Sequence, residues 1–220
     1  MLTSRMRSML VNQGVPPARL HRIPSGINET LFDVARDDPL PDLRRPRVLF
    51  VGRLVHQKNP HILIRAARLI DERAEIVIVG DGPERSRLQE EITNAGLDER
   101  VHLTGFVPHD EIPSYLSHAD VFALPSQYEE LGSVLIEAMR AGLPVVAADT
   151  GGIPEIVEAG QSGILVPPAD APALARATNR LLADRTLAEN LGNEGRRRSE
   201  RYRWSHLAGE VLNIYESLTA

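Results

Sequence analysis

The chain has 220 residues, a formal net charge of −5 and a hydrophobic fraction of 42%, which suits one large α/β domain or two small ones with a sizeable core. The negative net charge argues against nucleic acid as a partner, and the absence of cysteine excludes disulfides and thiolate chemistry. Because no apolar run reaches the length of a membrane-spanning helix and no apolar signal segment follows Met1, we expect a soluble cytoplasmic protein.

Residues 1–46 predict a leading segment outside the main pattern of the chain. Residues 4–13 predict a helix that ends at Gly14. The short apolar stretch Leu20–Pro24 predicts a strand, and residues 33–46, rich in Asp, Pro and Arg, predict a linker loop.

Residues 47–169 alternate between short apolar runs and amphipathic stretches. Strands are expected at Arg47–Val51, Glu75–Val79, Val101–Thr104, Val121–Leu124, Val145–Ala147 and Gly163–Val166. Helices are expected at 60–71, 83–95, 110–117, 132–141 and 153–159. The apolar runs are typical of strands buried on both faces, so the alternation predicts an α/β, Rossmann-like, doubly wound parallel sheet. Residues 170–220 predict a C-terminal helical tail, with helices at 170–184, 186–203 and 205–218.

Ligands of such sheets bind at the carboxyl ends of the strands, so the loops that follow the strands form the candidate site. The first loop runs from Gly52 to Pro60 and places Arg53 and Lys58 before a helix N-terminus. Two cations beside free helix N–H groups suit a diphosphate, whereas the alternative is a solvated loop with ordinary surface charges. Lys58 is the single lysine among 25 basic residues, Lys plus Arg.

The second loop, Gly80–Pro83, resembles the start of a dinucleotide fingerprint, but Arg85 stands where the third glycine belongs. Pro83 suits the first position of a helix, so we interpret the loop as a tight strand-to-helix turn. This departure disfavours a nicotinamide-dependent oxidoreductase.

The third loop contains Glu129 and leads into a helix that carries Glu137. The stretch Leu131-Gly132-Ser133 would present unpaired N–H groups at the helix start, where they can hold phosphate oxygens or sugar hydroxyls. Carboxylates suit the hydroxyls of a sugar or ribose, which donate hydrogen bonds to them. The alternative makes Glu129 a partner of the helix dipole and Glu137 a solvated residue, but Glu137 lies in an apolar run, where a carboxylate needs a partner.

Two further patterns concern metals and partners. The seven histidines show no spacing typical of metal ligands, so no metal site is expected. The basic run Arg196–Arg198, with Arg201 and Arg203, is interpreted as a solvated helix face; contact with a membrane surface or a partner is the alternative.

Taken in order, these loops resemble glycosyltransferase family 4, the large group of retaining GT-B enzymes. The matching motifs are G-R-L-x3-K at Gly52–Lys58, G-x-G-P at Gly80–Pro83, E-x7-E at Glu129–Glu137, Ala141–Val146, Gly151–Val157, Trp204-Ser205 and Tyr215. The similarity covers nearly the whole chain. Each motif alone is weak to moderate, but their order is highly specific.

The resemblance implies a site for a nucleoside-diphosphate sugar, which is a substrate, with no resident cofactor. Arg53 and Lys58 would hold the diphosphate, and Glu129 would contact the sugar near its reacting carbon. Glu137 would bind ribose hydroxyls. The expected catalytic residues of this hexosyltransferase are therefore Glu129, Arg53 and Lys58. The remaining donor contacts are expected from Gly52, the backbone of Leu131, Gly132 and Ser133, and the loop Gly105, Phe106 and Val107 beside the base.

Three departures from the family pattern matter. Glu130 stands where a small residue or proline is common and adds negative charge beside the sugar, and Pro24-Ser25-Gly26 replaces the usual P-N-G. The chain also starts just past the point where the family's N-terminal Rossmann domain, which binds the acceptor, would end. We therefore expect residues 1–220 to form a single C-terminal domain, one half of a GT-B fold, that is catalytically incomplete by itself.

Two functions stay open. With the N-terminal Rossmann domain as its partner, the chain would transfer the sugar to an acceptor with retention of anomeric configuration. The alternative is a stand-alone nucleotide-sugar-binding or regulatory module without catalysis, since fold and site are the same for both. An upstream reading frame that encodes a Rossmann-like domain would distinguish them.

Overall fold

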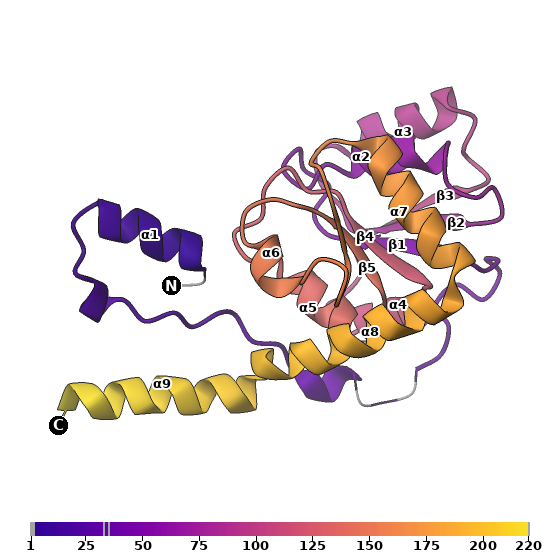
Figure 1. Ribbon diagram of the computed structural model, residues 1–220. Helices are drawn as coiled ribbons and strands as arrows, with labels where there is room; N and C mark the ends of the chain where they lie inside the picture. Colours follow the sequence, from indigo (N-terminus) through magenta and orange to yellow (C-terminus); the bar gives the residue numbers. More distant parts are fainter. Residues whose placement is uncertain (1–2, 33, 35, 220) are drawn as a thin grey trace.

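A single parallel sheet forms the centre of the computed structural model, which describes residues 3–32, 34 and 36–219. Six strands lie in the order β3-β2-β1-β4-β5-β6, and every pairing is parallel (Figure 1). The strands are β1 (Arg47–Val51), β2 (Glu75–Val79), β3 (Val101–Gly105), β4 (Val121–Leu124), β5 (Val145–Ala148) and β6 (Ile164–Val166). This order is that of the doubly wound dinucleotide-binding sheet, so the predicted Rossmann-like fold is confirmed.

Burial explains the apolar character of the strand sequences. Every residue of β1, β4 and β5 is buried, whereas the edge strand β3 has three half-buried residues, His102–Thr104. Central strands covered on both faces carry apolar side chains at every position, and the sequence therefore shows no polar alternation there.

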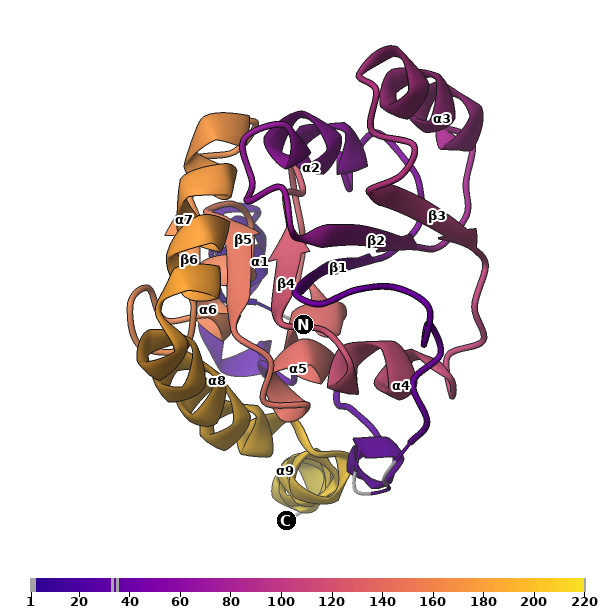
Figure 2. The same cartoon turned by 90° about the vertical axis from the view of Figure 1, so that its right-hand side faces the viewer.

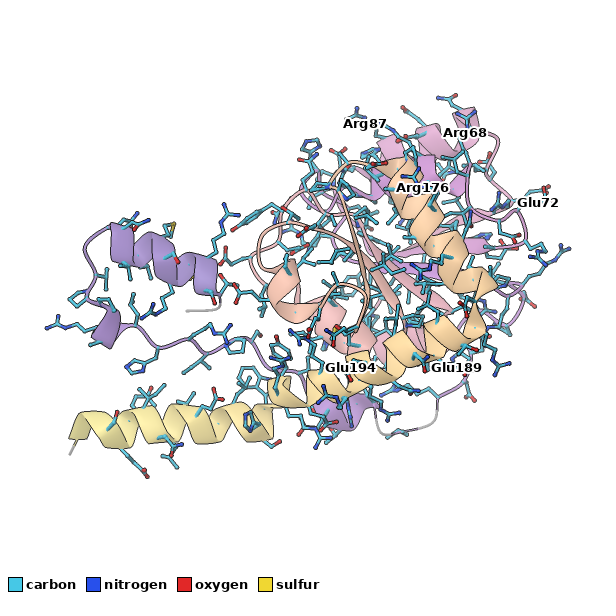
Figure 3. The ribbon with its side chains drawn as sticks, in the orientation of Figure 1. Arg68, Glu72, Arg87, Arg176, Glu189 and Glu194 are labelled. Atoms are coloured by element: carbon cyan, nitrogen blue, oxygen red, sulfur yellow. The ribbon has the colours of Figure 1, made fainter. Side chains whose placement is uncertain are left out.

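Helices cover both faces of the sheet (Figure 2). They are α2 (Pro60–Ala67), α3 (Arg85–Asn94), α4 (Ile112–Ser117), α5 (Ser133–Arg140), α6 (Ile153–Ile156) and α7 (Ala171–Ala183). α2 packs with α3 and α7, and α5 packs with α4. α2 ends before the predicted residue 71, because the amides of Leu69 and Ile70 both bond to the Ala66 carbonyl and tighten the chain. Charged side chains such as Arg87 on α3 and Arg176 on α7 lie on the outer surface (Figure 3).

The C-terminal tail continues with α8 (Arg185–Ser199) and α9 (Trp204–Thr219). α8 ends before the predicted residue 203, because Arg203 adopts an extended backbone and forms a β-bridge with Ile27. α8 packs closely on α5: a Cβ on Gly192 would lie 2.2 Å from the Gly142 carbonyl oxygen. α9 then projects beyond the sheet (Figure 1). Within the described residues, no helix is both long and apolar enough to cross a membrane.

The leading segment begins with α1 (Ser4–Asn12) and continues with two 3-10 turns, Pro17–Arg19 and Glu29–Phe32. The predicted strand at Leu20–Pro24 is wrong. A strand needs a neighbour for its backbone N–H and C=O groups, and the described part of this segment pairs solely through the single bridge at Ile27.

The predicted linker, residues 33–46, is irregular and tied to the sheet, although residues 33 and 35 lie outside the described residues. Its anchor is Arg47, the buried first residue of β1. The Arg47 guanidinium donates to the Asp38 carboxylate (2.7 Å) and to the Leu40 carbonyl (2.7 Å). The hydrogen bond from Arg47 lowers the pKa of Asp38.

A buried histidine joins α2 to α3. The Nδ1 atom of His61 lies 2.6 Å from Glu91 Oε2, and its Nε2 atom lies 2.9 Å from Glu84 Oε2. Ionised carboxylates only accept hydrogen bonds, so His61 is the donor in its hydrogen bond to Glu84. The hydrogen bond from His61 lowers the pKa of Glu84. The resulting stabilisation is present at neutral pH and is lost as the pH falls through that lowered value.

We expect His61→Ala to lower the free energy of unfolding by about 1–3 kcal/mol at pH 7, because two carboxylates lose a buried partner. Urea unfolding followed by circular dichroism measures this change. His206→Ala is the control, because its exposed pair with Glu210 on α9 should contribute about 0.5 kcal/mol or less. Equal urea midpoints for the two variants would contradict the role assigned to His61.

Candidate functional site

Loops that follow the strands form one continuous surface at the carboxyl edge of the sheet. We name three of them the lysine loop (Gly52–Asn59), the aromatic loop (Gly105–His109) and the glutamate loop (Ser126–Gly132). The Gly80 amide, after β2, donates to the Gly105 carbonyl (2.9 Å), and the Gln127 amide donates to the Gln57 carbonyl (2.8 Å). Segments far apart in the sequence therefore meet where the parallel topology predicts a ligand site.

Glycines allow the lysine loop to pack directly against the turn after β2. A Cβ on Gly80 would lie 2.0 Å from the Gly52 carbonyl oxygen, and a Cβ on Gly82 would lie 2.4 Å from the Leu54 carbonyl oxygen. Arg53 lies exposed between these contacts and forms no ion pair with a described residue. Its guanidinium is therefore available to an anion at this edge of the sheet.

Lys58 and Glu129 form an ion pair. The sequence analysis assigns Lys58 to the diphosphate and Glu129 to the sugar, which are neighbouring parts of the expected ligand. Lys58 Nζ lies 2.6 Å from Glu129 Oε1. The same carboxylate oxygen accepts a hydrogen bond of 2.7 Å from the hydroxyl of Ser126, which is fully buried. Glu129 itself is 5% exposed, so its charge depends on these two donors. Lys58 is thus partly neutralised by the residue beside it.

Ser126 is a site residue that the sequence analysis missed. It directly follows the buried strand β4 and Pro125, and it stands three positions before Glu129. The sequence places this hydroxyl between a strand expected to be buried and the carboxylate of Glu129. Because a buried polar side chain needs a partner, this position could have identified Ser126 as a partner of Glu129.

The start of α5 exposes backbone N–H groups beside this ion pair. Gly132 adopts a left-handed backbone (φ 81°) at the N-cap position, and no side chain caps the helix. The Ser133 and Val134 amides therefore have no partner within the helix, whereas the Leu135 amide donates to the Gly132 carbonyl (2.9 Å). The predicted stretch from Leu131 to Ser133 lies next to Glu129, as a site for phosphate or hydroxyl groups requires.

Glu137 on α5 has a polar partner, as we expected for a carboxylate in an apolar run. His109 Nε2 lies 3.0 Å from Glu137 Oε1. His109 belongs to the aromatic loop and its side chain is 68% exposed, whereas that of Glu137 is 13% exposed. The sequence analysis did not assign His109, because it lies 28 residues from Glu137 and no local pattern links the two.

The aromatic loop also presents Phe106 to solvent. Gly105, which begins the loop, is buried with φ 81°, while Phe106 is 76% exposed. An exposed aromatic ring on the loop that carries His109 is able to pack against a flat ligand group, and the next residue, Val107, is half-buried.

Glu130 points away from this surface. Its carboxylate accepts hydrogen bonds from the Thr3 hydroxyl (2.6 Å) and from the Tyr128 hydroxyl. The hydrogen bonds from Thr3 and then Tyr128 lower the pKa of Glu130. The Glu130 carboxylate, whose charge was expected beside the sugar, is therefore hydrogen-bonded to Thr3 at the start of α1 and to Tyr128. Its partners are not Lys58 or Arg53.

No group of three or more His, Asp or Glu side chains among residues 3–32, 34 and 36–219 has the arrangement of a metal site. The polar groups assigned to a ligand at the carboxyl edge include two cations, two acceptor carboxylates and a helix N-terminus. This set can neutralise a diphosphate and accept hydrogen bonds from hydroxyl groups.

Known proteins are similar in sequence to this chain over most of its length. The profile of the family described as "Glycosyl transferases group 1" matches residues 32–198. Alpha-D-kanosaminyltransferase of Streptomyces kanamyceticus is 36% identical over 230 residues, covering 99% of this chain and 60% of that protein. Alpha-maltose-1-phosphate synthase of Mycolicibacterium smegmatis is 36% identical over 225 residues, covering 93% of this chain and 58% of that protein.

Solved structures share the fold. Sucrose-phosphate synthase from Thermosynechococcus elongatus has a TM-score of 0.88 at 34% identity, covering 99% of this chain and 57% of that chain. HepE of Anabaena in complex with UDP-glucose has a TM-score of 0.89 at 27% identity, covering 98% of this chain and 62% of that chain. The chain spans about three fifths of the length of these relatives. The family profile and the relatives together show that this chain belongs to the glycosyl transferases group 1 family.

Proposed function

We propose that this chain is the donor-binding half of a retaining GT-B glycosyltransferase of family 4. It binds a nucleoside-diphosphate sugar and, with an N-terminal Rossmann domain, transfers the sugar to an acceptor. The observation that carries the proposal is the contact between Lys58 and Glu129 at the carboxyl edge of the sheet. In the proposal Lys58 binds the diphosphate and Glu129 binds the sugar, and the 2.6 Å between their Nζ and Oε1 atoms, near the start of α5, supports a shared site.

The described groups suggest how a donor would be bound. Arg53, Lys58 and the α5 amides suit the diphosphate, since cations and helix N-termini both attract it. Glu129 suits a sugar hydroxyl near the reacting carbon, and Glu137 suits the ribose hydroxyls, which donate to a carboxylate. Phe106 and its loop suit one side of the base.

In the proposed reaction, the bond between the anomeric carbon and the diphosphate oxygen breaks, and the acceptor oxygen bonds to that carbon from the same face. The proton of the acceptor hydroxyl passes to an oxygen of the departing diphosphate. Negative charge grows on the departing diphosphate, where Arg53, Lys58 and the helix N–H groups stabilise it without a metal ion. Glu129 stabilises the positive charge that develops on the sugar, and we assign no covalent nucleophile.

Two observations support a partner domain. The curated relatives are longer than this chain, which covers 60% and 58% of them. Large apolar side chains are also exposed on α1 and α9, namely Met9, Trp204, Leu212 and Tyr215. Surfaces of this kind favour a covering partner over solvent. A stand-alone nucleotide-sugar-binding module remains the alternative, and catalysis by a two-domain protein distinguishes it.

We expect the 220-residue chain to bind a nucleoside diphosphate in buffer containing EDTA and to transfer no sugar at a useful rate. Calorimetric titration with UDP, GDP, ADP and dTDP measures binding and identifies the base. Multiple-turnover transfer by this chain alone would overturn the half-enzyme proposal. Affinity that is lost on chelation and restored by magnesium or manganese would overturn the metal-independent mechanism.

A further inference from the structure

The glutamate loop (Ser126–Gly132) is held from three sides. On the first side, the Gln127 amide donates to the Gln57 carbonyl (2.8 Å) in the lysine loop. On the second side, the Gly152 amide donates to the Glu129 carbonyl (2.8 Å). Both contacts are between backbones and come with the packing of neighbouring strands. Side chains add to these two sides, since Gln57 Nε2 donates to the Tyr128 carbonyl (3.0 Å) and the Thr150 hydroxyl donates to the Gln127 carbonyl (3.0 Å). The third side is different, because it is formed by the distant N-terminal segment, through Thr3 and Arg5.

Glu130 makes this third attachment. Its Oε1 atom accepts from the Thr3 hydroxyl at 2.6 Å, and its Oε2 atom accepts from the Tyr128 hydroxyl. The Arg5 guanidinium lies 5.0 Å from the centre of the Tyr128 ring. One oxygen of the Glu130 carboxylate thus joins the glutamate loop to Thr3, and the other holds Tyr128, whose ring contacts Arg5 of α1.

A glycine makes room for this attachment. A Cβ on Gly152 would lie 2.0 Å from the Glu130 carbonyl oxygen and 2.8 Å from Thr3 Cγ2. Thr3 is fully buried there, and its hydroxyl also accepts from the Met6 amide as the N-cap of α1. Two segments 127 residues apart in the sequence therefore fit together around Gly152.

Apolar packing does not hold α1 in place. None of the residues Ser4–Asn12 is buried, and Figure 1 shows the helix standing away from the sheet. Ser4 adds contacts to Glu155, because its amide donates to Oε1 (2.8 Å) and its hydroxyl donates to Oε2 (3.1 Å). The attachment of α1 thus depends on a few polar contacts outside the hydrophobic core, and substitutions there should leave the core folded.

We propose that Glu130 is a positioning residue, which fastens the glutamate loop to α1 and thereby fixes the adjacent Glu129 for the donor sugar. The inference rests on the proposed function. Glu129 and Glu130 are consecutive and bind opposite partners: Lys58 and Ser126 hold the first, and Thr3 and Tyr128 hold the second. Fixing both side chains restricts the backbone between them, so releasing Glu130 gives Glu129 freedom that sugar binding must remove.

Limited trypsin digestion of the full chain tests the attachment. Cleavage after Arg5 or Arg7 requires α1 to open locally. We expect Glu130→Ala and Thr3→Val to be cleaved there about fivefold faster or more, because each removes a hydrogen bond to a charged group. Thr3→Ser retains the hydroxyl and should behave like the parent. Met9→Ala, on an exposed part of α1, is the control for substitution in the helix.

Calorimetry tests the positioning role. The quantity is the affinity for a nucleotide sugar divided by the affinity for the matching diphosphate, such as UDP-glucose over UDP if the parent binds UDP. We expect Glu130→Ala and Thr3→Val to lower this ratio about three- to tenfold, since ordering Glu129 opposes sugar binding. Affinity for the diphosphate alone should stay within about twofold, because its proposed ligands are unchanged.

The outcomes separate the two proposals. A parent chain that binds no nucleotide would overturn the proposed function and this inference together. A parent that binds both ligands, with an unchanged ratio in Glu130→Ala and Thr3→Val, would overturn this inference alone. An altered ratio with unchanged cleavage at Arg5 and Arg7 would also overturn it, because α1 would then not be the source of the effect.

Discussion

Replacing Lys58 with alanine is expected to cost about 1.5–3 kcal/mol of nucleoside-diphosphate affinity, the scale of a hydrogen bond between charged groups. Two effects act in the same direction. The diphosphate loses a cation, and the buried Glu129 carboxylate, 2.6 Å from Lys58 Nζ, loses its counter-charge and repels the phosphate. Calorimetric titration measures the loss. Affinity for the nucleoside without phosphate should hardly change.

Arginine at position 58 should recover part of the loss. The charge returns, but a planar guanidinium does not replace a compact ammonium beside Glu129 and Ser126. The Lys58 side chain is also only 22% exposed, so most of its stem is packed. Since this chain uses arginine at all its other Lys or Arg positions, an exposed position 58 would be expected to carry arginine too.

Arg68→Ala is the matched control for Lys58→Ala. It removes one positive charge from the exposed surface after α2, where Figure 3 labels Arg68. A uniform effect of net charge would weaken binding equally in both variants, whereas a site-specific effect appears at Lys58 alone. Parent-like diphosphate binding by Lys58→Arg would contradict the argument from shape.

The two glutamates of the E-x7-E motif are expected to give opposite results in the isolated chain. Glu137→Gln should weaken nucleoside-diphosphate binding by about 1–2 kcal/mol, because ribose hydroxyls lose a charged acceptor. Glu129→Gln should leave this affinity unchanged or raise it, because Lys58 no longer shares its charge with a carboxylate. The amide keeps the volume of the buried side chain, so the loop is not emptied by the substitution.

In a complete two-domain enzyme, the same substitutions should separate binding from turnover. Glu137→Gln should raise KM, because ribose is held in the ground state and the transition state alike. Glu129→Gln should mainly lower kcat, because its charge matters most when the anomeric carbon turns cationic. Glu90→Gln on the exposed surface of α3 is the control for loss of a carboxylate. Equal losses of diphosphate affinity at Glu129 and Glu137 would show that these roles are wrongly assigned.

The leading segment shows where local sequence patterns stop being informative. Leu20–Pro24 has the apolar composition of a strand, but a strand also needs a neighbouring backbone to pair with. The described part of the leading segment pairs with one through a single bridge, at Ile27, which lies outside Leu20–Pro24. The helix predicted at residues 4–13 was found at Ser4–Asn12, because capping and the stop at Gly14 are local properties. Local patterns also predicted α2 and α8, but not their last residues. The chain after α8, for example, is set by the bridge between Arg203 and Ile27, which are far apart in the sequence.

The sequence by itself determined the sheet, because apolar runs between amphipathic helices leave few alternatives to a doubly wound fold. It also identified the loops that the carboxyl edge brings together. The tertiary structure alone decided the side-chain partners: Lys58 with Glu129, His109 with Glu137, and Thr3 with Glu130. These pairs are 71, 28 and 127 residues apart. No periodicity encodes such contacts, because the direction of each side chain depends on how the whole chain packs.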